Sequence, residues 1–517
     1  MTGSDSTAPT EAALAADRRF FGHPLGLSTL FFTEMWERFS FYGMRAILIL
    51  FMVAPVTEGG LGLPVSEAGA IQGTYTAMVY MMTMAGGWFA DKLIGLRRSV
   101  FWGGVLIMAG HISLAFPGLG PFYLGLILLV LGTGLLKGNI SAMVGQLYSP
   151  DDTRRDAGFS LYYMGINLGG FLGPLVCGFF AQSEGFRSTL AGWGMQPESA
   201  WHFGFAAAAV GMFFGLIQYQ LGRKRFPERA ERPLGLAHPA EGPTAWRWFR
   251  VVATVVLGAV VVTALLHRME AITVTAAGFA GFIDAFLIFL TVGFFTWLFT
   301  VAKWTPEERK RLIVIVVLFL GAAVFWAGFE QAASTLNLFA DRNTANTFFG
   351  WSYPPSWLQS VNSFFIIVFA PIVGLIWLKL GTKNPSQPAK FSLGLFFLAA
   401  SYALMVLGAL SAASGERVSP MWLIGCFFLQ TVGELCLSPV GLSAMSKLAP
   451  NRVQGLMMGV WFLASAVGNK VAGRVGGLYE SFSVPSIFGA NAVFVLVFAV
   501  LMALLVVPIR RMLAARS

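Results

Sequence analysis

Long apolar runs alternate with short charged segments along nearly the whole chain. A helix needs about 20 apolar residues to cross a bilayer, and the runs predict about fourteen such spans. They cover approximately residues 25–54, 68–94, 98–116, 121–147, 158–182, 202–222, 247–267, 273–301, 312–340, 356–380, 391–413, 419–447, 453–479 and 484–508. The pattern therefore predicts an all-α, polytopic membrane protein.

Composition and charge support this class and exclude others. With 56% hydrophobic and 12% charged residues, the chain of 517 residues is too apolar for a soluble globular protein. Its net charge of +10 lies in short connections and not in one patch, so we expect no nucleic-acid partner. The basic residues gather on alternate connections, which predicts that both termini are cytoplasmic. The three cysteines lie inside apolar segments without the spacing of a metal site or a disulfide framework.

The spans divide into two sets of six that faintly resemble each other, as in transporters built from repeats. A charged, Pro-containing linker and two further spans separate the sets. These two spans carry little buried charge, so we interpret them as a scaffold. The predicted organisation is a cytoplasmic tail (1–22), an N-terminal six-helix bundle (23–222), a linker with two extra transmembrane helices (223–310), a C-terminal six-helix bundle (311–508) and a second cytoplasmic tail (509–517).

The first span carries a stripe of charge. Residues three and four apart share one face of a helix, which places Glu34, Glu37, Arg38, Tyr42 and Arg45 together. Each ionisable residue at the centre of a membrane helix costs about 2.5 to 3.5 kcal/mol. The stripe must therefore face other helices or a water-filled cavity, where opposite charges neutralise one another.

Further ionisable residues lie inside later spans, namely Lys137, Glu330 and Glu434, and they nearly balance the charge of the first span. They could be fixed ion pairs that hold the bundle together, but intramembrane charge usually marks a transport or proton pathway. Lys470 and Arg474 lie near the end of the eleventh span, where we expect their side chains to extend to the membrane surface. Together with buried amides and aromatic walls, the charges suit a small zwitterionic substrate.

Five motifs make the resemblance to a known family specific. They are E-M-W-E-R-F-S-F-Y from Glu34, G-T-G-L-L-K-G-N-I around Lys137, D-A-G-F-S-L-Y-Y-M-G-I-N-L-G from Asp156, F-W-A-G-F-E-Q around Glu330 and G-E-L-C-L-S-P-V-G-L-S around Glu434. The chain resembles the proton-dependent oligopeptide transporters (POT family) of the major facilitator superfamily, bacterial type. The resemblance implies proton-coupled uptake of di- and tripeptides across the bacterial cytoplasmic (inner) membrane by alternating access. It also implies a multi-pass protein, which we expect to be a monomer, driven by the proton gradient without a cofactor or metal.

The resemblance also implies residue roles. Glu34, Glu37 and Arg38 would form the proton-coupling cluster, and Arg45 with Glu330 and Lys137 with Glu434 would be gating ion pairs. The residues implied in peptide binding are Arg38, Tyr42, Tyr80, Lys137, Asn167, Trp326, Glu330, Asn362, Trp461 and Ser465. Within this set, Arg38 and Lys137 would take the peptide carboxylate, and Glu330 with Asn167 and Asn362 the amino terminus.

Departures from the family pattern leave the substrate open. Phe41, Gly138, Phe329 and Gly73 stand where many or some family members have Tyr, Pro, Glu and His, respectively. A same-fold carrier of nitrate or another small organic ion is therefore one alternative. An intramembrane enzyme is a second, although the five histidines are scattered and no nucleotide-binding loop occurs. A channel is a third, but paired repeats with breakable ion pairs favour alternating access.

Overall fold

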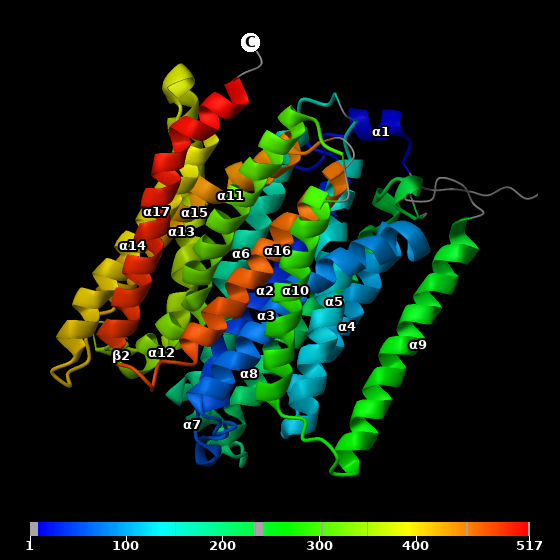
Figure 1. Cartoon of the computed structure of the whole chain (residues 1–517). Coiled ribbons are helices and arrows are strands. Elements are labelled where there is room, and N and C mark those ends of the chain that lie inside the picture. The colour runs from blue at the N-terminus through cyan, green and yellow to red at the C-terminus, as the bar shows by residue number, and fades with distance from the viewer. Residues whose placement is uncertain are drawn as a thin grey trace, which may run out of the picture.

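The computed structural model describes residues 9–149, 151–231, 233, 241–300, 303–348, 350–450 and 453–514, which are predominantly helical. Figure 1 shows long helices that run side by side, with α1 and the C-terminus at the same end of the molecule. We call this end the terminal end and the opposite end, where α2 stops and α3 begins, the distal end. The expected all-α architecture is confirmed.

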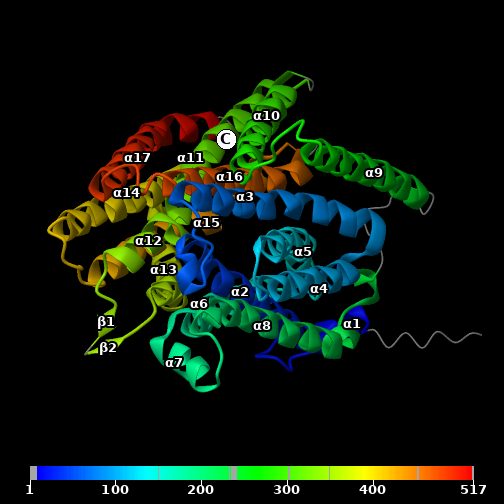
Figure 2. The same cartoon turned by 90° about the horizontal axis from the view of Figure 1, so that it is seen from below.

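The N-terminal half contains eight helices among the residues described. They are α1 (Glu11–Ala16), α2 (Leu25–Val53), α3 (Val65–Phe89), α4 (Leu96–Leu114), α5 (Leu119–Gln146), α6 (Arg155–Gln182), α7 (Glu184–Gly192) and α8 (Ala200–Gly222). A hairpin of two helices follows, formed by α9 (Glu241–Arg268) and α10 (Ala276–Thr300). In both views α9 stands outside the other helices, and α10 lies against α3 and α16 (Figures 1 and 2).

The C-terminal half repeats the arrangement of long helices. It consists of α11 (Pro306–Phe329), α12 (Thr335–Arg342), α13 (Ser360–Leu380), α14 (Gln387–Ala412), α15 (Met421–Leu448), α16 (Gln454–Gly476) and α17 (Val484–Ala514). The strands β1 (Thr347–Phe348) and β2 (Trp351–Ser352) form a small antiparallel hairpin in which Phe348 pairs with Trp351. Figure 2 shows the two halves as separate groups of helices that meet along α3 and α16.

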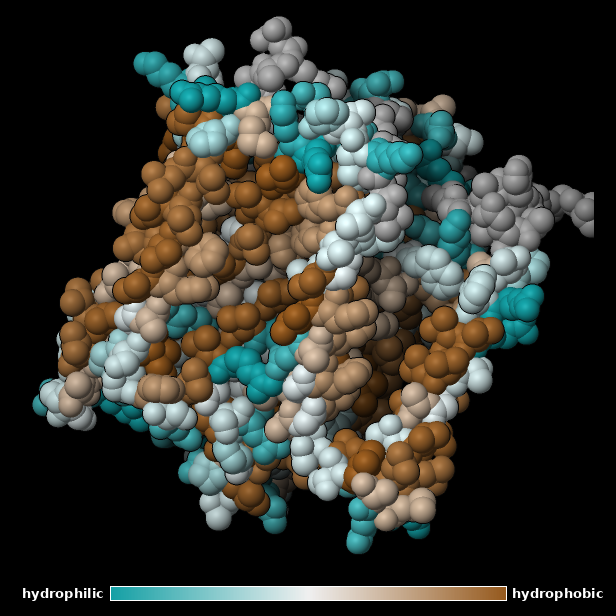
Figure 3. All heavy atoms as spheres, in the orientation of Figure 1, coloured by the Kyte–Doolittle hydropathy of each residue, from teal (hydrophilic) through white to brown (hydrophobic). Residues whose placement is uncertain are grey.

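Among the described residues, ten helical segments are long and apolar enough to cross a membrane. The helices α2, α3, α4 and α16 fall outside this set, and α2 contains four ionisable residues. The expected number of about fourteen spans therefore stays a prediction. Figure 3 shows apolar side chains over the outer helices α14 and α17 and polar side chains gathered at the terminal end.

The seventh span is not the continuous helix that the sequence predicts over 312–340. Instead, α11 ends at Phe329, a 3₁₀ turn covers Glu330–Ala333, and α12 starts at Thr335. Backbone groups freed by a break inside a membrane need partners from neighbouring helices. Gln72 Nε2 on α3 supplies one by donating to the Ala333 carbonyl at 3.3 Å. Side chains far away in the sequence thus stabilise the break beside Glu330.

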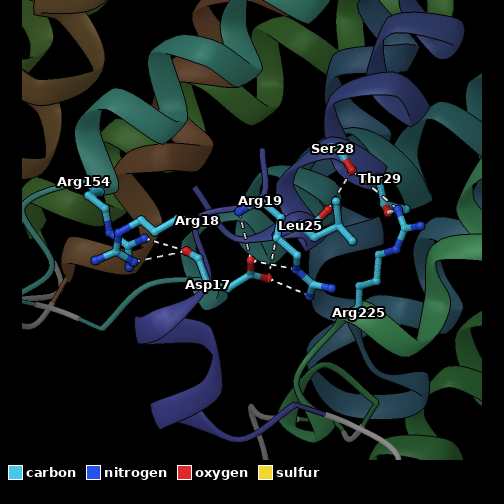
Figure 4. A network of polar contacts seen from close by, with 8 residues as sticks. All are labelled: Asp17, Arg18, Arg19, Leu25, Ser28, Thr29, Arg154 and Arg225. Atoms are coloured by element: carbon cyan, nitrogen blue, oxygen red, sulfur yellow. Dashed lines mark hydrogen bonds and ion pairs between the residues drawn. The ribbon is translucent and has the colours of Figure 1, made fainter. Parts of the chain in front are cut away.

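Hydrogen bonds tie the segment before α2 to the terminal end of the N-terminal half (Figure 4). Asp17 accepts from the Leu25 N–H at 2.9 Å and from the Arg19 guanidinium, and both hold the pKa of Asp17 well below its usual range. Arg154, at the start of α6, donates to the carbonyls of Asp17 and Gly22. Because Asp17 supplies an acceptor at the start of α2, this network fixes where the charged helix begins.

Close helix packing inside the N-terminal half depends on glycine. A Cβ added to Gly43 on α2 would lie 2.9 Å from the carbonyl oxygen of Gly173 on α6 and 2.5 Å from Cys177 Sγ. Small residues at such crossings let two membrane helices approach closely.

We expect Gly43→Ala to lower the melting temperature of the purified protein in detergent, because the added methyl group overpacks a backbone contact at a cost of about 1 to 3 kcal/mol. Gly293→Ala on α10 is the matched control, since its Cβ would meet no atom within 4 Å. Equal melting temperatures for the two variants would contradict the proposed packing role of Gly43.

Candidate functional site

The charged stripe of α2 forms a compact buried cluster. Arg38 Nε lies 3.0 Å from Glu34 Oε1 and 2.5 Å from Glu37 Oε2, and all three side chains are at most 4% exposed. Among the described residues, Glu34 Oε2, Glu37 Oε1 and Arg38 Nη2 are buried without a hydrogen-bond partner. Two carboxylates thus share one guanidinium and leave hydrogen-bonding capacity unused.

Lys137 on α5 belongs to the same N-terminal half as the Glu34–Arg38–Glu37 cluster. Its Nζ is 3.9 Å from the centre of the Tyr80 ring on α3, which is a cation–π contact. Lys137 also lies within the electrostatic reach of Glu37 and Glu330. The residue as a whole is only partly buried.

The C-terminal half contributes carboxylates and an amide. Asn362 Nδ2 on α13 donates to Glu434 Oε2 on α15 at 3.4 Å and to Thr431 Oγ1 at 2.9 Å. Tyr42 on α2 interacts electrostatically with Arg38, Arg45, Glu330 and Glu434, so it lies between the two halves. The site therefore presents a mainly basic wall on one side and an acidic wall on the other.

One of the two expected gating pairs is formed. Arg45 on α2 makes an ion pair with Glu330 at the break after α11, and both side chains are largely buried. No ion pair between Lys137 and Glu434 occurs in the part of the chain that the structure describes. In this state Glu434 is held by Asn362, and the Lys137–Glu434 pair stays a prediction.

Aromatic side chains lie beside the charges on α11 and α16. The rings of Trp326 and Trp461 are 6.5 Å apart at an angle of 83°, and Trp326 Nε1 is buried without a partner among the described residues. Ser465 donates to the Trp461 carbonyl, and Asn167 donates to the Tyr163 carbonyl. The Ser465 hydroxyl and one amide hydrogen of Asn167 thus bond within their own helices, whereas the Trp326 N–H is free to donate to a ligand.

Three residues near the site were not among those to which a binding, coupling or gating role was assigned from the sequence. Tyr162 interacts with Glu34, Tyr163 is 39% exposed and interacts with Glu434, and Thr431 accepts from Asn362. Thr431 precedes Glu434 by three residues, so helical spacing could have identified it. The two tyrosines fall within the family motif that contains Asn167, but no spacing rule separates their roles.

The halves meet closely at the distal end. Ser360 donates to the Phe171 carbonyl at 2.7 Å, and Trp357 Nε1 donates to the Leu175 carbonyl at 2.9 Å. Asn337 Nδ2 on α12 donates to the Ala46 carbonyl on α2 at 2.7 Å. These contacts, together with the Arg45–Glu330 pair, join the two halves near the distal end.

Comparison with known proteins identifies the family. A sequence model described as the POT family matches residues 97–492, which is more than half of the chain. The chain belongs to the POT family. The resemblance that the motifs carry is thereby confirmed, and the fold is that of POT transporters.

Relatives cover nearly the whole of this POT transporter. It is 40% identical over 510 residues to the peptide transporter YePEPT of Yersinia enterocolitica, with 96% of each chain covered. It is 39% identical over 511 residues to a di-/tripeptide transporter of Lactococcus lactis subsp. cremoris, covering 96% of this chain and 98% of the relative. A crystal structure of peptide transporter POT in complex with sulfate matches with a TM-score of 0.86 and 41% identity, covering 98% of this chain and 99% of the other.

A double-mutant cycle tests the Arg45–Glu330 pair. We expect Arg45→Gln and Glu330→Gln each to lower the melting temperature in detergent, because breaking a buried pair leaves one charge uncompensated at a cost of about 3 to 5 kcal/mol. The double variant should recover part of the loss. Glu480→Gln, which breaks the exposed Arg342–Glu480 pair, is the control and should have a small effect. Strictly additive effects of the two glutamine substitutions would contradict the pairing.

Proposed function

We propose that the protein is a symporter that takes up di- and tripeptides together with protons across the bacterial cytoplasmic membrane. The observation that carries the proposal is the Glu34–Arg38–Glu37 cluster, whose unpartnered buried atoms lie in the N-terminal half, opposite the acidic wall of the C-terminal half. The relatives named as peptide and di-/tripeptide transporters support the substrate class. We also propose that the protein acts as a monomer with both termini in the cytoplasm, and that the proton gradient drives transport without a cofactor.

The two walls fit the two ends of a peptide. Arg38 presents a planar fork that can bind a carboxylate through two hydrogen bonds, and Lys137 adds a point charge beside it. On the opposite side, Glu330 can receive the peptide ammonium group, and the amide oxygen of Asn362 adds an acceptor there. Asn167, on α6 of the N-terminal half, adds a second amide oxygen. Tyr42, Tyr80, Trp326, Trp461 and Ser465 then contact the peptide side chains, which differ between substrates.

Coupling follows from the sharing of one guanidinium by two carboxylates. When a peptide carboxylate binds Arg38, Glu34 and Glu37 lose part of the positive charge that stabilises their ionised forms. A buried carboxylate without a cationic partner favours its neutral form, so one of the two binds a proton. Peptide and proton binding thus favour each other, because the bound carboxylate strengthens the attraction of the cluster for a proton, and the bound proton removes a negative charge that would repel the carboxylate.

The gating pairs would alternate during transport. The Arg45–Glu330 pair joins the two halves in the present structure, and we propose that it closes the distal end. A peptide ammonium group that competes for Glu330 would release Arg45 and let this end open. We propose that Lys137 then pairs with Glu434 and closes the terminal end, so that the site faces one side of the membrane at a time.

Uptake into proteoliposomes tests the proposed function. With an inward proton gradient, we expect radiolabelled dialanine to accumulate above its external concentration, because the gradient supplies the driving force. A protonophore should abolish accumulation, and trialanine should compete with it. Uptake that nitrate inhibits and trialanine does not would contradict the peptide assignment and favour another small ion.

A second experiment tests the coupling cluster. Glu37→Gln should abolish gradient-driven accumulation of dialanine, because the amide cannot take up a proton. Exchange of internal for external dialanine without a gradient should persist at a reduced rate. Glu58→Gln is the control, since this acid is exposed at the distal end and contributes only its backbone carbonyl to the Trp201 contact. Full gradient-driven accumulation by Glu37→Gln would overturn the role of this residue.

A further inference from the structure

The inserted hairpin carries one acid inside a membrane-length helix. Asp284 is the only ionisable residue of α10, and it follows the spacing of the buried residues Ala280, Ile283 and Leu287. These positions recur at intervals of three and four, so Asp284 lies on the face of α10 that packs against the bundle. The expectation that the two extra spans are merely scaffold gives no reason for an acid at this place.

Asp284 has two cationic partners on α16. Its Oδ1 lies 3.3 Å from Lys470 Nζ, and its Oδ2 accepts from Arg474 Nε at 3.0 Å. The Lys470 side chain is 5% exposed, whereas that of Arg474 is 45% exposed. Lys470 therefore does not extend to the membrane surface, contrary to the expectation from sequence, because a carboxylate from the hairpin compensates its charge where it is.

Lys470 lies at the seam where the two halves touch. Its Nζ donates to Thr74 Oγ1 on α3 at 2.6 Å, so one ammonium group joins the N-terminal half, the C-terminal half and the hairpin. Next to it, a Cβ added to Gly73 would lie 2.9 Å from the Gly473 Cα. The backbones of α3 and α16 thus approach each other closely beside the paired lysine.

The other inserted helix, α9, makes few contacts with the helices of the two halves. The residues of α9 that follow its first turns are exposed, and its aromatic contacts are those of Trp246 and Phe249 with Phe89. Among the residues described, Asp284 is therefore the residue through which the hairpin makes ion pairs with the seam. Without the charge of Asp284, the Lys470 ammonium group would be buried with no counter-ion in the closed seam. Its loss should therefore destabilise the closed state more than the open one.

We infer that Asp284 is a positioning residue for transport: it holds Lys470 in the α3–α16 seam and so favours the state that is closed at the distal end. This inference rests on the alternating-access function proposed above. It assigns a conformational role to the inserted hairpin, which would stabilise one of the two states by supplying a counter-ion that neither six-helix half provides at this position.

Distance measurements between two spin labels test the inference without any substrate. Thr57→Cys and Ser481→Cys place labels on exposed residues at the distal ends of the two halves, and the three native cysteines are buried. We expect Asp284→Asn to raise the ratio of long to short distances by about tenfold, because the closed seam would then contain an uncompensated charge. Glu270→Gln, which removes an exposed acid of the same hairpin, should leave the distances unchanged.

A second-site variant separates charge from packing. Adding Lys470→Gln to Asp284→Asn removes the uncompensated charge, so the double variant should return towards the wild-type distances. Unchanged distances in Asp284→Asn would overturn the inference, as would a double variant no closer to wild type than the single one. If Asp284→Asn does not fold, a folded double variant supports the pairing and an unfolded one overturns it. If the wild-type protein does not transport dialanine but Asp284→Asn still changes the label distances, the proposed function is refuted. The role of Asp284 in holding Lys470 in the seam would then still stand.

Discussion

The structure depends on the compensation of charge inside a bundle of apolar helices. Arg38 can stay buried because it contacts two carboxylates, and Glu330 because it pairs with Arg45. With Lys137 and Glu434 included, the central site holds four acids and three bases, so it has one carboxylate more than its bases can balance. A dipeptide zwitterion adds no net charge. One proton would bring the loaded site to neutrality, which gives the proposed coupling an electrostatic basis independent of any single contact.

The same constraint acts at the seam between the halves. Lys470 is as deeply buried as the members of the central cluster, but its carboxylate comes from α10 and not from either six-helix half. A lysine without this partner would have to reach the membrane surface or draw water into the seam. The hairpin and the transport core are therefore linked through an ion pair, although α9 touches the core at few places.

Much of the architecture could be predicted from the sequence, because helical spacing and hydropathy act locally. The stripe from Glu34 to Arg45 forms one face of α2, and most predicted spans agree with the helices within a few residues. The break after Phe329 was missed, since Gln72 stabilises it from a different helix. The position of Lys470 was mistaken for the same reason. Its partner, Asp284, lies in a segment whose composition alone suggested a scaffold.

Glycine contacts and ion pairs contribute differently to the movement that alternating access requires. The Gly73–Gly473 approach gives α3 and α16 a close contact made of backbone atoms, which no substrate can alter by charge. Arg45–Glu330 can respond to a charged ligand, because a peptide ammonium group competes for the same carboxylate. Lys470 and Asp284 lie outside the central site, so a peptide bound there does not compete directly for their charges. A seam that combines close backbone packing, a counter-ion from the hairpin and one ligand-sensitive pair can hold the distal end closed at rest and still open when substrate takes the place of a single partner.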